Sequence, residues 1–399
     1  MTDIKPKINR ILSIDIMRGL TLFLMLFVND LFEPGVPGWM VHAKGNIDGM
    51  GLADWVFPGF LFMVGMAIPY AIGSRMKNGE SKLKVFLHII LRTASLLLIG
   101  LLMVNHERLN SELSGINGNL YAILMYLSIF LIWNKYPETS KLKKLFLGLK
   151  ILGVLTLVFL ALIFKAGDPG HVTWFKTSWW GILGLIGWGY LVAATASLFI
   201  GSKLGPTVIV WLSFIGINIL SQSGMLNFLN FLNPIFGVII DGNVPMIVLA
   251  GLVCSVILKQ SKFNEGKTAG IFLAMGTLSL AVGFFLRNWF IISKIQGTPS
   301  WGMICNGISL IVFALLYWMI DIQGKNKWAA VFKPAGQNSL TTYLAPDVIY
   351  FAIWGLSLPL FFYKQESSQL LAVCGSLGWA LAMVGFAALL SRINIRLKL

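Results

Sequence analysis

Apolar stretches of roughly 20 residues, separated by short polar connections, recur along the whole chain. In helical form, about 20 apolar residues cross the roughly 30 Å hydrocarbon core of a bilayer. The pattern therefore predicts an all-α, polytopic transmembrane helix bundle of about 10–12 spans. The predicted spans are residues 13–32, 52–73, 83–104, 118–133, 144–165, 179–200, 207–222, 243–259, 268–289, 301–320, 338–357 and 369–391.

The span count is least certain around residues 221–245, where asparagines and Asp241 lie among aromatic residues. Such a segment fits an interfacial or re-entrant piece as well as a loop. The pattern favours twelve spans over ten.

Composition agrees with this assignment, since 57% of the residues are hydrophobic and only 12% are charged. That balance excludes a soluble domain with a wetted surface. We expect one membrane-embedded domain over residues 1–399, in contact with membrane lipid, in a bacterial inner (cytoplasmic) membrane. The first apolar stretch is interpreted as a signal anchor, because it carries Asp15 and Arg18 and has no small-residue cleavage site.

The net charge of +15 follows the predicted membrane topology. Of the 31 Lys and Arg residues, 21 fall in the connections on one side, 7 on the other and 3 within spans. The positive-inside rule then predicts that both termini are cytoplasmic. Because topology explains the charge, no nucleic-acid partner is expected.

The three cysteines, Cys254, Cys305 and Cys374, lie in apolar spans without CxxC or Cys/His spacing. Neither a metal site nor a disulfide framework is indicated, so we expect no metal and interpret these cysteines as packing residues.

Polar and ionisable side chains gather unusually in the first two spans and the loop between them: Asp15, Arg18, Asn29, His42 and Asp54. Such groups are costly at membrane depth and mark functional sites by default.

Topology separates the four histidines. His88 is predicted near the cytoplasmic side, whereas His42, His106 and His171 fall in outer connections. A solvated loop residue is the simplest interpretation of each. His42 stands out because its glycine-rich loop, residues 38–51, leads directly into the second span.

Two blocks of motifs, far apart in the sequence, resemble the heparan-α-glucosaminide N-acetyltransferase family of transmembrane acyltransferases. The N-terminal block comprises Arg10, Asp15, Arg18-Gly19-Leu20-Thr21, Val28-Asn29, His42-Ala43, Ala53-Asp54-Trp55-Val56-Phe57-Pro58 and Gly65. The C-terminal block comprises Pro299, Trp301, Asp321, Gly324, Gly336-Gln337-Asn338-Ser339-Leu340 and Tyr343. The resemblance is to a bacterial type of this family, without a luminal domain ahead of Arg10.

The resemblance implies transfer of an acetyl group from cytoplasmic acetyl-CoA, as co-substrate, to the amine (or hydroxyl) of an extracytoplasmic sugar or glycan. It places the family's essential histidine at His42, its helix asparagine at Asn29 and its motif aspartate at Asp54. It also suggests a homodimer. The sequence leaves the acceptor open.

Amine acetylation needs a base or a nucleophilic carrier, and neutral imidazole can serve as either. The sequence does not choose between these roles for His42. Asn29 is interpreted as orienting the imidazole or stabilising an oxyanion, or alternatively as a helix-to-helix hydrogen bond. Asp54 either fixes the tautomer of His42 or caps the second span.

Binding of CoA phosphates requires cationic side chains that donate paired hydrogen bonds, for which Arg18 and Arg92 are the candidates. Arg18 can instead pair with Asp15 three residues earlier, whereas Arg92 has no carboxylate at helical spacing. Asn338, Ser339 and Tyr343 form a polar stripe at the start of the eleventh span, interpreted either as a contact for the cofactor or as a helix cap.

A secondary transporter or a flippase of a small polar or glycan substrate is the alternative function. Asp347 is the one candidate for a coupling acid in the eleventh span. No second half of the chain matches residues 10–68, as internal symmetry would require, so the enzyme is preferred.

Overall fold

The computed structural model describes residues 11–137, 141–260 and 265–399. Within these ranges the chain is helical, with isolated bridges but no strand. Arg10, which opens the N-terminal motif block, lies outside the described residues, as do Lys5, Lys7 and Lys262, which entered the charge comparison.

Every predicted span falls on a helix. The helices are α1 (Leu12–Asp30), α2 (Leu52–Lys77), α3 (Lys82–His106), α4 (Ser111–Ser114), α5 (Gly118–Trp133), α6 (Lys143–Ile163), α7 (Gly181–Ile200), α8 (Leu204–Gln222), α9 (Asn233–Asp241), α10 (Asn243–Gln260), α11 (Glu265–Leu286), α12 (Pro299–Tyr317), α13 (Lys333–Gln337), α14 (Ser339–Gly355) and α15 (Gln369–Arg392).

In the described part of the chain, ten helical stretches are long and apolar enough to cross a membrane. This confirms the predicted polytopic bundle. The twelve predicted spans exceed these ten because they include α5 and α14, which have only 16 and 17 residues. The ambiguous region forms a 3-10 turn, Asn227–Leu232, followed by α9, whose residues are not buried.

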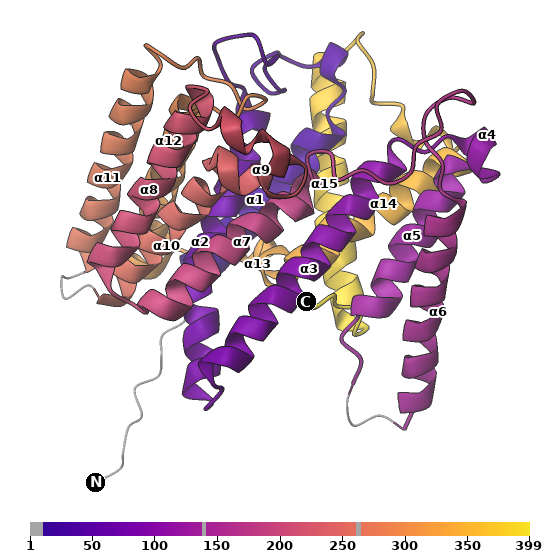
Figure 1. Cartoon of the computed structure of the whole chain (residues 1–399), viewed down its shortest axis with the longest axis horizontal. Helices are drawn as coiled ribbons and strands as arrows, with labels where there is room; N and C mark the ends of the chain where they lie inside the picture. The colour runs from indigo at the N-terminus through magenta and orange to yellow at the C-terminus, as the bar shows by residue number, and fades with distance from the viewer. Residues whose placement is uncertain (1–10, 138–140, 261–264) are drawn as a thin grey trace.

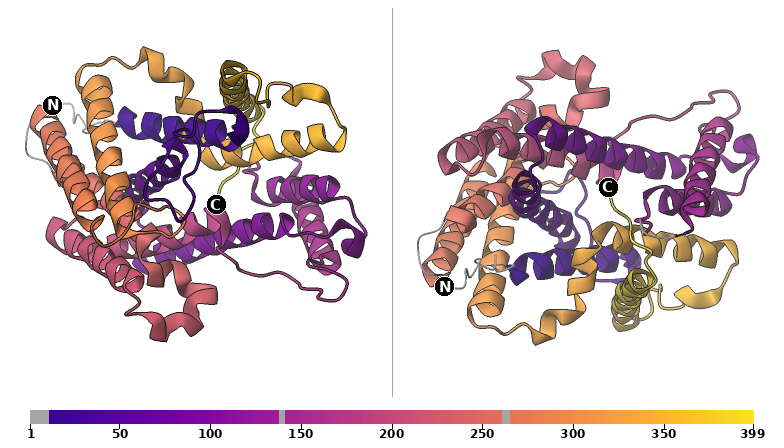
Figure 2. Two further views of the ribbon diagram at one scale, coloured as in Figure 1. Left: turned by 90° about the horizontal axis from the view of Figure 1, so that it is seen from above. Right: turned by 90° about the horizontal axis from the view of Figure 1, so that it is seen from below.

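The core of the bundle is formed by α1, α2, α7, α10 and α12 (Figures 1 and 2). Around it, α3 packs on α7, α11 on α12 and α8 on α10, while α5, α6, α14 and α15 form the opposite flank. The outermost helix, α6, contacts α5 and exposes a band of leucine, valine and phenylalanine side chains that suits lipid.

One very close helix contact joins α2 and α10. A Cβ added at Gly65 would lie 1.9 Å from the carbonyl oxygen of Val248, and one at Gly251 would lie 1.9 Å from that of Phe62. Small residues let two helix backbones approach in this way, and in lipid such van der Waals packing drives helix association.

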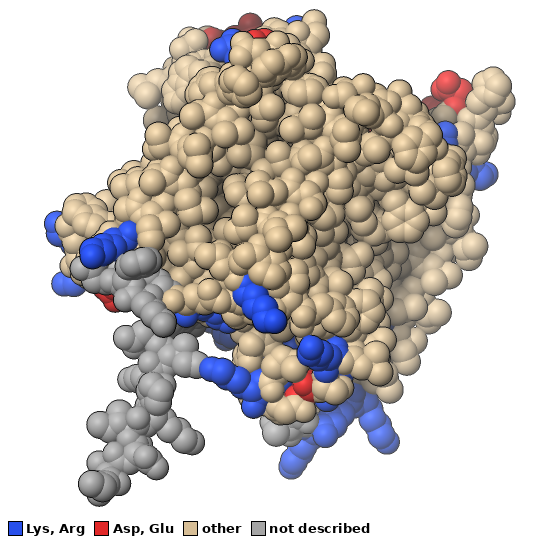
Figure 3. Space-filling model, turned by 60° about the vertical axis from the view of Figure 1, so that its left-hand side comes forward, with Lys and Arg blue, Asp and Glu red and all other residues tan. Residues whose placement is uncertain are grey.

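Charge divides between the two ends of the bundle. Figure 3 shows Lys and Arg gathered at the lower end, with a broad uncharged band above them. We call that end the basic face and the end with the α1–α2 loop the outer face. Cys254 and Cys305 are buried, as expected of packing residues, whereas Cys374 is exposed on α15, so the packing interpretation is wrong for Cys374.

Candidate functional site

His42 and Asp54 form the clearest pair of reactive side chains on the outer face. The Nδ1 atom of His42 lies 2.7 Å from Oδ1 of Asp54. Asp54 is buried, whereas 38% of the His42 side chain is exposed. A buried carboxylate therefore holds one ring nitrogen of a histidine whose side chain reaches solvent.

The loop that carries His42 is anchored on the first turn of α2. The amides of Leu52 and Ala53 donate to the carbonyls of Trp39 and Met40, at 2.7 and 3.2 Å. A Cβ at Gly51 would lie 2.0 Å from the carbonyl oxygen of Val41, so this close approach requires glycine. These contacts direct the chain back over the start of α2 and bring His42 to Asp54.

The contacts of Asp54 fit both of its interpretations, as a cap of α2 and as a partner of His42. Its Oδ2 atom accepts from the amide of Gly51 at 2.9 Å, which caps α2, and from the amide of Ala43 at 3.0 Å. The other oxygen remains for His42. From the far side, the indole of Trp301 donates to the Asp54 backbone carbonyl at 3.2 Å, so α12 supports the same turn.

Lys294 is the third member of a cluster with His42 and Asp54, and no sequence motif singled it out. It lies in the connection between α11 and α12, and its Nζ atom is 3.2 and 3.3 Å from the two ring nitrogens of His42. Burial lowers the pKa of Lys294, and the negative charge of Asp54 opposes part of that effect. Because the two partners are 252 positions apart, no local pattern in the sequence could have paired them.

Asn29 is not brought into hydrogen-bonding contact with His42. It lies exposed in the last turn of α1, and its side chain makes no hydrogen bond to the other described residues. Its helical position is informative nonetheless. Arg18, Leu22, Met25 and Asn29 follow one another at spacings of four, three and four, so they share one face of α1.

That face of α1 lines a cavity of about 600 Å³. Its walls come from α1, α2, α3, α7, the segment from α13 to α14, and the C-terminal residues. All five residues assigned to cofactor binding from the sequence line this one cavity: Arg18, Arg92, Asn338, Ser339 and Tyr343. In sequence they are as much as 325 positions apart, between 18 and 343, so only the fold assembles them.

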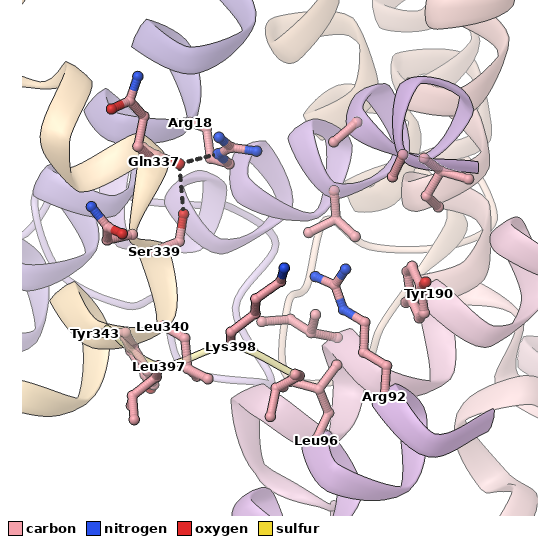
Figure 4. Close-up of a pocket in the computed structure, with 18 of the residues that line it drawn as sticks. Arg18, Arg92, Leu96, Tyr190, Gln337, Ser339, Leu340, Tyr343, Leu397 and Lys398 are labelled. Atoms are coloured by element: carbon pink, nitrogen blue, oxygen red, sulfur yellow. Dashed lines mark hydrogen bonds between the residues drawn. The ribbon is translucent and has the colours of Figure 1, made fainter. Parts of the chain in front are cut away.

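The cavity contains four basic side chains, of which two have carboxylate partners. Arg18 pairs with Asp15 at 2.9 Å, as its spacing predicted, and Arg75 pairs with Glu80 at the same distance. Arg92 and Lys398 make no ion pair with the described residues. Figure 4 shows both of them extending into the space opposite Arg18 and Ser339.

Arg92 contacts an aromatic ring on another helix. The guanidinium carbon lies 4.6 Å from the ring centroid of Tyr190 on α7. Its Nε atom is buried without a hydrogen-bond partner among the described residues. A buried donor without a partner is costly, so this group is suited to an anionic ligand in the cavity.

The polar stripe at α14 does not act as a helix cap. Asn338 occupies the N-cap position but its side chain makes no capping hydrogen bond. The side-chain amide (Nδ2) of Asn338 instead donates to the carbonyl of Pro334 at 3.4 Å, and the Ser339 hydroxyl donates to the carbonyl of Gly336 at 3.1 Å. Ser339 thus has an acceptor oxygen left to face the cavity (Figure 4).

The cavity runs from the basic face toward the His42 cluster. Its lowest residues on α2 include Arg75, and its highest is Phe60. Phe60 is six residues from Asp54, or about 9 Å along the helix at ~1.5 Å per residue. On α1, Asn29 lies one turn beyond Met25, the uppermost lining residue of that helix.

The other predicted residues are distributed as follows. His88 lines the cavity and lies 2.9 Å from an Arg75 nitrogen, whereas His106 packs against aromatic rings and His171 is exposed in its loop. Arg75 and Lys398 also line the cavity, although the sequence did not single them out. Their positive charge could be read from the sequence, but the side of the helix bundle to which their side chains point could not.

Comparisons with known proteins point the same way. Residues 10–179 match a family model described as "Domain of unknown function (DUF5009)". The chain is 32% identical over 184 residues to heparan-alpha-glucosaminide N-acetyltransferase of Mus musculus, covering 41% of this chain and 27% of that protein. It is 33% identical over 120 residues to the Homo sapiens protein of the same name, covering 30% and 18%.

The matched stretch thus spans about a quarter or less of each curated relative. Within that stretch, the family resemblance inferred from the motifs is confirmed.

Proposed function

We propose that this chain, which is similar over its matched part to heparan-alpha-glucosaminide N-acetyltransferase, is a transmembrane acetyltransferase. It moves an acetyl group from acetyl-CoA, bound from the basic face, to the amine or hydroxyl of a sugar or glycan at the outer face. By the positive-inside rule the basic face is cytoplasmic, as in a bacterial inner membrane.

The observation that carries this proposal is the cavity. It has the volume typical of small-molecule and cofactor sites, and it extends from the basic face toward His42. Arg92 and Lys398 offer cationic donors for the phosphates of CoA, and Arg18 can add to them. The apolar residues farther up α1 and α2, such as Leu22 and Phe60, suit the less polar arm that ends in the thioester.

At the outer end, Asp54 prepares His42 for reaction. An ionised Asp54 accepts from Nδ1–H, which leaves the lone pair of Nε2 available. That atom can take a proton from the acceptor's ammonium group, or it can accept the acetyl group and pass it on. The contact is equally compatible with both schemes.

Asn29 is proposed to contact the thioester rather than the imidazole. It continues the cavity-lining face of α1 by one turn, and its amide is free of other hydrogen bonds among the described residues. A donor at that point can stabilise the oxyanion that develops on the acetyl carbonyl.

The test is acetyl transfer from labelled acetyl-CoA to glucosamine-terminated acceptors, with the full chain in proteoliposomes. Wild-type protein is expected to label the amine, and His42→Ala is expected to lose this activity. His171→Ala is the matched control, because His171 is an exposed histidine in another loop. If the wild type neither transfers acetyl groups nor binds acetyl-CoA, the proposal fails and transport becomes the leading function.

A further inference from the structure

The amine of Lys294 lies beside His42, where the proposed function brings the acceptor amine. Its Nζ atom lies 3.3 Å from Nε2 and 3.2 Å from Nδ1. These distances are within hydrogen-bond reach, so a proton can pass between this amine and the imidazole. The nearest amine to the reactive imidazole therefore belongs to the protein itself.

Hydrogen bonds between the two loops hold this arrangement. Gly49 N donates to the carbonyl of Ile292 at 3.0 Å. The side chains of Ser293 and Gln296 both donate to the carbonyl of Gly45, at 3.0 and 2.8 Å. Residues on both sides of Lys294 are thus tied to the loop that carries His42.

Asp48 adds a charged clasp at the edge of the same contact. One carboxylate oxygen accepts from the amide of Ile292 at 2.8 Å, and the other pairs with Arg287 at 2.8 Å. Since Ile292 is two residues from Lys294, the clasp limits how far the amine can move from His42.

The environment also makes Lys294 a better nucleophile than an ordinary surface lysine. Burial lowers its pKa, so a larger fraction of the amine is neutral, although the facing Asp54 carboxylate limits the effect. His42 lies beside it as the group to which an amine proton can pass.

We propose that Lys294 is an internal acceptor of this enzyme and becomes acetylated on Nζ when no sugar amine is present. The Nζ lone pair forms the amide bond to the acetyl carbon, and the bond from that carbon to sulfur, or to His42 if the acetyl group is carried there, breaks. In the direct route, the one proton that the attacking nitrogen loses passes through His42 to the departing thiolate, so CoA leaves as the thiol. In the carrier route, the CoA thiol has already left, and this proton stays on the imidazole as the acetyl group departs from it. The inference rests on the proposed acetyltransferase function.

Acetylation would have two physical consequences. It removes the positive charge of Lys294 from beside His42 and Asp54, and it places a neutral amide in the space that the acceptor amine needs. The modification therefore turns the site off when acceptor is scarce. A bound acceptor amine displaces Lys294 and suppresses the modification.

The experiment incubates the reconstituted full chain with acetyl-CoA alone and follows acetyl occupancy by peptide mass spectrometry. Lys44 is the internal control, because it lies in the same outer loop as His42 but is exposed. Lys294 is expected to be acetylated roughly a hundredfold faster than Lys44, which is modest against the effective molarities of oriented groups. The label should survive hydroxylamine, as an amide does and an acetyl-imidazole does not.

Three variants and an added acceptor sharpen the result. His42→Ala and His42→Gln should both reduce the Lys294 rate to that of Lys44, and Lys294→Arg should abolish the hydroxylamine-stable label in this peptide. Glucosamine should slow Lys294 acetylation in the wild type. Equal rates at Lys294 and Lys44, or no effect of glucosamine on a rapid Lys294 reaction, would overturn the inference.

A parallel transfer assay separates the two proposals. If glucosamine is acetylated while Lys294 stays unmodified, the internal-acceptor inference is wrong and the acetyltransferase function stands. If neither amine is acetylated, both proposals fail.

Discussion

Replacing Asp54 with asparagine should disable His42 while leaving the donor cavity intact. In the wild type, Oδ1 faces Nδ1 of His42 at 2.7 Å and Oδ2 accepts from two backbone amides. In Asp54→Asn the amide oxygen must stay with the backbone donors, so its NH2 group turns toward Nδ1. A donor at that position favours the tautomer that carries its proton on Nε2.

The expected loss follows from the role of the imidazole. A protonated Nε2 can neither accept a proton nor attack the thioester, and positioned acid–base groups contribute about 10²–10⁴ in rate. At ~1.36 kcal/mol per tenfold, this range corresponds to about 3–5 kcal/mol of transition-state stabilisation. Affinity for CoA should be unchanged, because Asp54 does not line the cavity.

The assay compares steady-state acetyl transfer and CoA binding for wild type, Asp54→Asn and Asp168→Asn. Asp168 is the control, since it is an exposed outer-loop aspartate whose side chain contacts neither His42 nor the cavity. Thermal unfolding of each variant in detergent checks that the turn at α2 survives. Transfer by Asp54→Asn within about threefold of wild type would refute the reasoning, because a wrong tautomer cannot leave so much activity.

Other consequences can be checked separately. Arg92→Gln should weaken CoA binding by roughly 10- to 150-fold, because a hydrogen bond to a charged group contributes about 1.5–3 kcal/mol; calorimetry would show this, and an unchanged Kd would exclude Arg92 from the phosphate site. Gly65→Ala should destabilise the bundle by about 1–3 kcal/mol through the α2–α10 clash, whereas Gly216→Ala, with open space around its Cβ, should not; equal unfolding midpoints would contradict the packing argument. The amide of Ile292 and the guanidinium of Arg287 lower the pKa of Asp48 below 3.8, so the clasp is present above pH 3.8 and is lost as pH falls through the lowered value. The Ile292 amide should therefore stay protected from hydrogen exchange from pH 8 to about 4 in the wild type but lose protection at pH 7 in Asp48→Ala, which has no acceptor oxygen at this position; equal protection in both would show that the clasp is not needed.

Much of the fold follows from the sequence because lipid imposes a simple rule. A segment that crosses hydrocarbon must satisfy its own backbone hydrogen bonds, so about 20 apolar residues specify a helix with little help from tertiary contacts. All twelve predicted spans accordingly fall on helices, including the short ones at α5 and α8. The ion pair of Asp15 with Arg18 was predictable for a similar reason, since helical spacing alone sets their distance.

The candidate site was only partly predictable. Single residues, such as Arg92 in α3 or His42 in a glycine-rich loop, stood out because polar groups at membrane depth are costly. The pairing of Asp54 with His42 stayed one of two alternatives, and the structure satisfies both because a carboxylate has two oxygens to share. The exposed position of Cys374 could not be predicted, since lipid-facing and packed surfaces look alike in sequence.

By itself, then, the sequence determined which segments cross the membrane and which side chains are chemically unusual, because both depend on local composition and spacing. Tertiary structure alone decided that residues from 18 to 343 share one cavity and that Lys294 lies against His42. These associations depend on how helices pack and how loops cross, which close approaches such as that of Gly65 to α10 fix. Residues hundreds of positions apart carry no spacing signal, so their meeting is a property of the folded chain.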